Sequence, residues 1–166
     1  MKGNELVNIP GPGIASDSNQ VNDPSSSTIS IKRFTSADEV LFDTLTDIWA
    51  STGVGNPARG DDLATIQTTL LHGGLIILAY LDDQAIGATW LTHDWRRLYI
   101  HHMAVLEEFR DQGVGRLLLN EALAYASQIG IQPKLEVHHA NPRARHLYES
   151  AGFTYIEGYW VMVKRG

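Results

Sequence analysis

Residues 110–116 read Arg110-Asp111-Gln112-Gly113-Val114-Gly115-Arg116 and lie between an apolar run at 98–106 and a helical pattern at 117–129. This order predicts a strand, a tight turn and the first turn of a helix. A helix N-terminus presents unpaired backbone N–H groups and the positive end of the helix dipole. Glycines let an anion approach that backbone closely, so the stretch predicts an anion-binding turn, with a pyrophosphate as its natural ligand.

Two common nucleotide-binding signatures do not fit this turn. The dinucleotide-binding fingerprint requires a third glycine at position 118, which is Leu118. A P-loop requires a lysine and a hydroxyl residue after its glycine, whereas Gly115 is followed by Arg116 and Leu117. The turn therefore belongs to neither class.

The composition of the 166 residues is that of an ordinary globular protein, with 43% hydrophobic and 19% charged residues. The net charge of −6 disfavours a nucleic-acid partner. The sequence contains no cysteine, which excludes disulfides, thiolate metal ligands and a cysteine nucleophile. No apolar run has the length of a membrane span, so we expect no membrane association and a cytoplasmic location.

Two regions differ in composition. Residues 1–28 are rich in Gly, Pro, Ser, Asn and Asp, which predicts a flexible N-terminal extension. Residues 29–166 predict one domain, whose sequence alternates between strand and helix patterns. Ser36 is expected to cap the first helix with Glu39 completing a capping box, and Asn141 to cap the last helix with Pro142 following.

The order of these patterns predicts an α+β fold of the α/β-sandwich kind. We expect a mixed, mostly antiparallel sheet of about seven strands, covered by about four helices. The expected strands are 29–34, 75–81, 85–92, 98–106, 134–139, 153–157 and 159–164, and the expected helices are 37–50, 60–71, 117–129 and 142–150.

A second motif lies about thirty residues after the glycine turn. Residues 141–153 (Asn-Pro-Arg-Ala-Arg-His-Leu-Tyr-Glu-Ser-Ala-Gly-Phe) resemble the Asn-x-x-Ala-x-x-Leu-Tyr-x-x-x-Gly-Phe signature of the GCN5-related N-acetyltransferases. That family also has an Arg/Gln-x-x-Gly-x-Gly/Ala turn upstream, after a strand that ends in a triplet such as 103–105 (Met-Ala-Val). The resemblance covers roughly residues 29–164 and is most specific between 98 and 153.

The resemblance implies that acetyl-CoA binds in a cleft where two parallel strands splay apart, here 98–106 and 134–139. Backbone groups around Met103 and Val105 would pair with the pantetheine arm, and amides at 112–116 would hold the pyrophosphate. Asn141 would reach the pantetheine arm while also capping its helix. The expected cofactor-binding residues are Met103, Ala104, Val105, Arg110, Asp111, Gln112, Gly113, Val114, Gly115, Arg116, Asn141, Arg145 and Tyr148.

The resemblance also implies catalytic roles. Tyr148 matches the tyrosine that reprotonates the leaving thiolate in many relatives; packing of the helix onto the sheet is the alternative role. Many relatives use a glutamate base on the strand before the glycine turn, but the matching residue here is Tyr99. His101 matches the base histidine of arylalkylamine N-acetyltransferases, and imidazole titrates near neutral pH.

Strand alternation places His101 on one face with Tyr99 and Met103, and His102 on the opposite face. The adjacent pairs 101–102 and 138–139 would then each split across two faces. Neither pair forms a His-Glu-x-x-His motif, so we expect no metal site.

These features predict an N-acetyltransferase that transfers the acetyl group of acetyl-CoA to a primary amine by direct attack in a ternary complex. The alternative is a catalytically silent acyl-CoA-binding regulatory module, which the missing glutamate at Tyr99 favours. We expect a small-molecule or peptide amine as the acceptor and a homodimer as the assembly.

Overall fold

The computed structural model describes residues 28–55 and 57–164. The expected N-terminal extension lies outside the described residues apart from Thr28. The elements follow the order β1 (Ile29–Phe34), α1 (Glu39–Thr52), η1 (Pro57–Arg59), α2 (Leu63–Leu71), β2 (Leu75–Leu81), β3 (Gln84–His93), β4 (Arg97–Val105), η2 (Glu107–Phe109), α3 (Val114–Ile129), β5 (Gln132–Leu135) and α4 (Pro142–Ser150).

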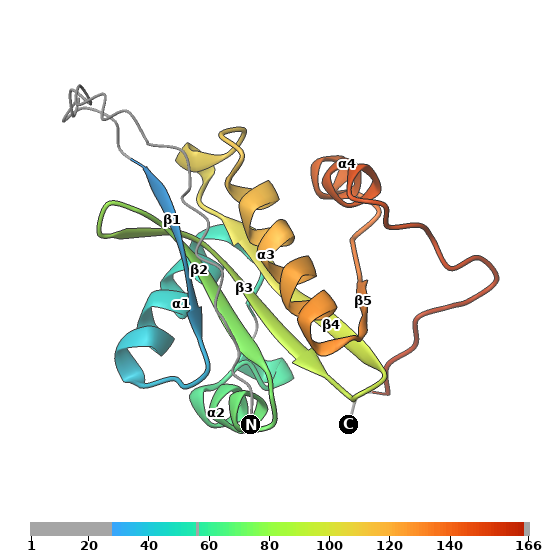
Figure 1. The fold of residues 1–166 in the computed structure, drawn as a ribbon, viewed down its shortest axis with the longest axis horizontal. Helices are drawn as coiled ribbons and strands as arrows, with labels where there is room; N and C mark the ends of the chain where they lie inside the picture. The colour runs from blue at the N-terminus through green and yellow to red at the C-terminus, as the bar shows by residue number, and fades with distance from the viewer. Residues whose placement is uncertain (1–27, 56, 165–166) are drawn as a thin grey trace, which may run out of the picture.

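The strands form one mixed sheet in the order β1-β2-β3-β4-β5 (Figure 1). The first three pairings are antiparallel, and β4 pairs with β5 in parallel. The α+β class is therefore confirmed, but the sheet has five described strands, not about seven.

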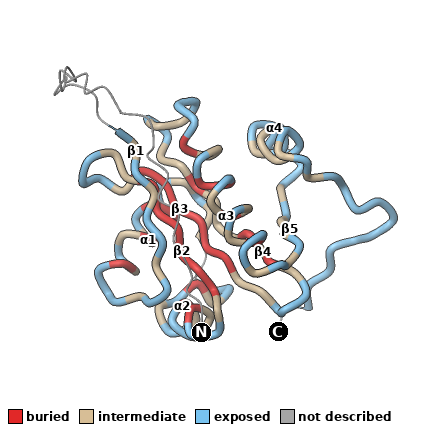
Figure 2. The backbone as a smooth tube through the Cα atoms, viewed as in Figure 1, coloured by how far each residue is buried: buried red, intermediate tan, exposed pale blue. Residues whose placement is uncertain are grey.

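Helices cover both faces of the sheet, and each face has its own apolar core. On one face, α3 packs Leu118, Leu119 and Ala122 against the sheet. On the other face, α1 and α2 pack against β2 and β3 through residues such as Trp49 and Ile66. Figure 2 shows the buried residues concentrated in β2, β3 and the inner side of α3. This two-sided burial explains why β2 is apolar along its whole length.

Helix caps agree with the sequence at one end of the chain and differ at the other. Asn141 caps α4, because its side chain accepts a hydrogen bond from the Ala144 N–H at 3.0 Å, with Pro142 at the start of the helix. The predicted Ser36 cap is wrong. Asp38 caps α1 instead, because its side chain accepts a hydrogen bond from the Leu41 N–H at 2.9 Å and the helix begins two residues later than expected.

The last predicted strands differ most from the structure. The strand expected at 134–139 is β5, which ends at Leu135 because a turn follows in which the Asn141 N–H donates to the His138 carbonyl. The strands expected at 153–157 and 159–164 are absent from the described residues, and seven large apolar side chains there are exposed. Strand-like sequence needs a partner to pair with, and this segment has none within the described chain.

None of the described helices is long and apolar enough to cross a membrane.

Candidate functional site

A cleft of about 630 Å³ opens where β4 and β5 separate. Their last pairing joins Ile100 to Leu135, after which β4 continues to Val105 without β5 beside it. The cleft is lined by Thr52, Val54, Met103, Ala104, Val105, Arg110, Asp111, Gly113, Gly115, Arg116, Asn141, Arg143, Ala144, His146, Leu147 and Tyr148. The end of β4, the glycine turn and α4 therefore meet around one cavity, as the two motifs predicted.

The glycine turn forms the N-terminus of α3. Gly113 adopts a left-handed conformation with φ of 83°, and no side chain caps the helix. The regular backbone bonding begins with the Leu117 N–H donating to the Gly113 carbonyl at 3.0 Å. The preceding amides are thus free of a side-chain cap and point out of the helix end, the arrangement that binds anions.

A glycine at position 115 keeps the cleft open between α3 and α4. A Cβ at this position would lie 3.4 Å from Cδ2 of Leu147 and 3.9 Å from Cγ2 of Val105. Any longer side chain would enter the cavity that the glycine leaves. Gly115 therefore allows α4 and β4 to lie close to the start of α3, whereas Gly113 allows the left-handed turn.

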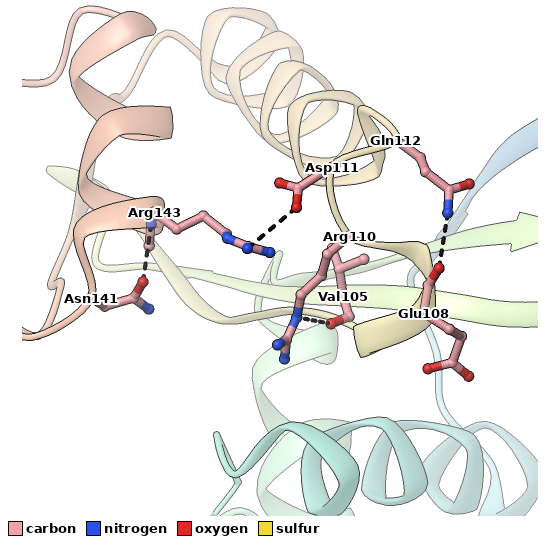
Figure 3. A network of polar contacts seen from close by, with 8 residues as sticks. Val105, Glu108, Arg110, Asp111, Gln112, Asn141 and Arg143 are labelled. Carbon is pink, nitrogen blue, oxygen red and sulfur yellow. Dashed lines mark hydrogen bonds and ion pairs between the residues drawn. The ribbon is translucent and has the colours of Figure 1, made fainter.

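Three arginines surround the same end of the cleft. Arg110 donates from Nε to the Val105 carbonyl at 3.2 Å, and Arg116 donates to the hydroxyl of Ser150 on α4. Arg143 lies 3.3 Å from the carboxylate of Asp111, which itself adopts a left-handed φ of 61° (Figure 3). Cationic side chains from α4 and the turn thus face the N-terminus of α3, which suits a polyanion.

Ten of the predicted binding residues line the cleft and three do not. The amide of Gln112 donates instead to the Glu108 carbonyl at 2.9 Å. Val114 is buried in the core at 1% exposure, and Arg145 lies 3.8 Å from Glu149 along α4. Val114 can still contribute its backbone N–H.

Several lining residues were missed by the sequence analysis. Arg143, Ala144, His146 and Leu147 lie within the second motif, whose helical spacing could have identified those on its inner face. Thr52 ends α1 and Val54 follows it, and neither was among the expected cofactor-binding residues.

Tyr148 lines the cleft from α4. Its ring is half-buried and lies edge-on to that of Phe153, with centroids 6.0 Å apart. Burial raises the pKa of the Tyr148 hydroxyl, so the group stays protonated at neutral pH. Both roles weighed for this residue, proton donor and packing group, are compatible with this position.

The prediction that His101 and His102 point to opposite faces is wrong. The register between β3 and β4 shifts between the pairs Ala88–Ala104 and Trp90–His101, and His102 has φ of 50°. This bulge inserts an extra residue, so both imidazoles lie on the α1/α2 face and contact Trp90. Met103 packs on the α3 face instead of sharing the face of His101.

His101 sits one residue beyond the last β4–β5 pairing but is not among the residues lining the cleft. Its Nε2 lies 2.8 Å from the Thr92 hydroxyl, and its ring stacks on Tyr99 at 6.0 Å. Burial lowers the pKa of His101, and the neighbouring His102 lowers it further. Glu136 and Asp61 raise this pKa, but by less. The imidazole is therefore neutral at physiological pH.

Within the described residues, no three side chains of the His, Cys, Asp or Glu type gather to hold a metal ion.

Comparison with known proteins agrees with this geometry. The family model of the acetyltransferase (GNAT) family matches residues 41–153. An uncharacterized N-acetyltransferase of Archaeoglobus fulgidus is 32% identical over 83 residues, which cover 45% of this chain and 56% of that protein. N-alpha-acetyltransferase 50 of Danio rerio is 33% identical over 91 residues, which cover 51% of this chain and 54% of that protein.

Solved structures share the fold at low sequence identity. An acetyltransferase from Streptococcus agalactiae has a TM-score of 0.68 at 18% identity, with 82% of this chain and 90% of that chain covered. The aminoglycoside acetyltransferase AAC(6')-Iy, in complex with a bisubstrate analogue of CoA, has a TM-score of 0.69 at 18% identity, with 84% and 100% covered.

The chain belongs to the GNAT acetyltransferase family. The alignments span just over half the length of the two curated relatives described above.

Proposed function

We propose that this protein is an acetyl-CoA-dependent N-acetyltransferase that acts on a primary amine. The observation that carries this proposal is the cleft where β4 leaves β5, closed at one end by the uncapped N-terminus of α3. The relatives named as N-acetyltransferases, and the structure of AAC(6')-Iy with CoA, support it.

The residues present fit the chemistry of CoA. The amides of Gly113, Val114, Gly115 and Arg116 would hold the pyrophosphate, with Arg116 and Arg143 as cationic neighbours. Met103, Val105 and Leu147 would flank the pantetheine arm. Asn141 lines the same cleft and would contact this arm as well. When bound, acetyl-CoA supplies a thioester carbonyl that a neutral amine can attack.

The mechanism needs a proton acceptor and a proton donor on this chain. The backbone N–H near Met103 would stabilise the negative charge that develops on the carbonyl oxygen. Tyr148 would donate its proton to the leaving sulfur, and burial keeps this hydroxyl protonated. An imidazole on β4 would remove the proton of the ammonium acceptor; the resemblance favours His101 for this role, and the adjacent His102 is the second candidate. The absence of cysteine from the sequence supports direct attack over an acyl-cysteine intermediate.

A panel of amines tests the proposal by release of free CoA from acetyl-CoA. The panel should include polyamines, aryl amines, amino acids, aminoglycosides and peptides. Amine-dependent release, with a product heavier by one acetyl group, is expected for at least one class. Binding of acetyl-CoA without turnover on any class would favour the regulatory module, for which the absence of a glutamate at Tyr99 argues.

The homodimer and the cytoplasmic location stay predictions. The exposed apolar segment from Tyr155 to Val163 supports self-association, because seven large apolar side chains there are more than 60% exposed. Light scattering on the purified protein distinguishes a dimer from a monomer.

A further inference from the structure

The imidazole of His102 and the carboxylate of Asp61 form a buried pair beside the cleft. Nε2 of His102 lies 2.9 Å from Oδ2 of Asp61, and the two side chains are 16% and 8% exposed. Asp61 comes just before α2, so the pair joins α2 to β4 across 41 positions of sequence. Asp61 and Thr89 are the two buried polar residues within the described ranges. A buried carboxylate is costly unless it serves a partner, and its partner here is an imidazole.

The remaining nitrogen of His102 lies next to another unpaired polar atom. Within the described residues, Nδ1 of His102 and Nε1 of Trp49 are buried without a hydrogen-bond partner, and their rings are 4.8 Å apart. A carboxylate at Nε2 requires a proton on that nitrogen, so the lone pair of the neutral imidazole lies on Nδ1. The indole N–H can only donate. A buried donor beside a buried acceptor suits one water molecule or one polar ligand group that bridges the two.

The backbone is distorted where this pair is formed. The φ of 50° at His102 is left-handed, a conformation that is strained for a residue with a Cβ. The bulge is also what turns His102 toward Asp61 instead of toward α3. Such distortions persist where the surrounding structure holds them, and they cluster at functional sites.

His102 adjoins residues that line the cleft. Met103 and Ala104, the next two residues of β4, line the cleft. Val54 also lines it, and the Val54 N–H donates to the Trp49 carbonyl at 3.2 Å. The two unpaired nitrogens therefore belong to residues that are connected to the lining of the cleft, His102 through the chain and Trp49 through the hydrogen bond from Val54.

We propose that His102 accepts the proton of the ammonium acceptor through a bridging water, with Asp61 as its positioning residue. This inference rests on the proposed function and deepens it. The ammonium loses one proton and Nδ1 of His102 gains one, so that a neutral amine and an imidazolium are formed without any redox change. The Asp61 carboxylate stabilises that imidazolium, whereas Nε2 of His101 pairs with the Thr92 hydroxyl.

Ionisable groups of the described residues approach this pair from several elements. Asp61 faces it from before α2, His101 lies beside it on β4, and Glu136 after β5 acts on His101. The helix α1 and strand β3 contribute Trp49 and Trp90, which do not ionise.

Two variants test the assignment, with steady-state kinetics, pH profiles and thermal unfolding measured for each. Asp61→Asn keeps the shape but removes the charge, and should lower kcat by about 10²-fold or more without changing KM for acetyl-CoA. His102→Gly suits the left-handed backbone, and free imidazole should restore part of its activity.

Tyr125→Phe is the matched control, since it removes a half-buried hydrogen bond to the Gly73 carbonyl on the other face. It should lower the melting temperature and leave kcat unchanged. In the wild type, nitrogen-15 spectra of histidine should show His102 protonated at Nε2 and unprotonated at Nδ1, a readout that needs no variant.

An active wild type whose Asp61→Asn variant keeps the wild-type kcat would overturn the assignment, above all if His101→Gln abolishes turnover. A wild type without amine-dependent turnover would instead overturn the proposed function itself, and this inference with it.

Discussion

The guanidinium of Arg143 lies 3.3 Å from the carboxylate of Asp111, and this contact joins α4 to the turn that precedes α3 (Figure 3). Both side chains are more than half exposed, at 61% and 74%. An exposed ion pair contributes only about 0–1 kcal/mol, so a bound anion can readily replace the carboxylate. We expect the pyrophosphate of CoA to compete with Asp111 for Arg143.

Opposite effects on CoA affinity follow for the two residues. Arg143→Ala should weaken CoA binding several-fold, whereas Asp111→Asn should strengthen it, because the competing carboxylate is lost. Calorimetric titration at low and high salt measures both, and the Arg143→Ala effect should shrink as salt screens the charge. If both variants weakened CoA binding equally, the ion pair between Arg143 and Asp111, and not the release of Arg143 from it, would be what CoA binding requires.

The two glycines of the turn should respond differently to substitution. Gly115→Val places a side chain in the cleft and should weaken CoA binding by about 10-fold or more, roughly 1.4 kcal/mol. Gly113→Ala meets no atom within 4 Å, but its φ of 83° should cost roughly 1–2 kcal/mol of folding stability. Urea unfolding and CoA titration of both variants separate the effects. A Gly115→Val variant with wild-type affinity for CoA would show that close approach at Gly115 is not needed for binding.

Tyr148→Phe should lower kcat by about 10²-fold or more and leave KM for acetyl-CoA unchanged. Burial raises the pKa of this hydroxyl, so the loss of wild-type activity from its ionisation should fall above about pH 10, the usual range of tyrosine. Tyr155→Phe is the control, since that exposed hydroxyl bonds Glu149 at 3.0 Å. Full turnover in Tyr148→Phe across the pH range would reduce Tyr148 to a packing role.

His101 should make folding stability depend on pH. Its pKa is lowered in the folded state, chiefly by burial, so the unfolded chain binds a proton more readily. The free energy of unfolding should therefore fall as the pH drops below about 6.5, the usual value of histidine. Urea unfolding at pH 7.5 and 5.5 measures this loss, which should be smaller in His101→Gln. An identical loss in both proteins would assign it to other groups.

Local sequence patterns predicted the framework of this site well. The glycine turn and the Asn141 motif each specify a helix start by its own short-range chemistry, and both starts face one cleft in the structure. The strands at 29–34 and 75–81 also follow from alternation and apolar runs alone.

Long-range features escaped prediction for physical reasons. The bulge at His102 depends on the register of β4 against β3, which no local pattern encodes. Its extra residue interrupts the alternation of side chains, so residues on the two sides of the bulge point to faces that simple alternation does not predict. The Asp61–His102 pair joins residues from two distant elements and was therefore invisible in the sequence. The segment 153–164 has strand-forming residues but no partner strand among the described residues.

The central claim is that the amides at the N-terminus of α3 bind the pyrophosphate of CoA. Titration of nitrogen-15-labelled protein with CoA, followed by proton–nitrogen correlation spectra, tests it most directly. We expect the largest chemical-shift changes at the amides of Gly113, Val114, Gly115 and Arg116. Smaller changes are expected at Met103 and Asn141. Unchanged amide signals at 113–116 in the presence of saturating CoA would contradict it.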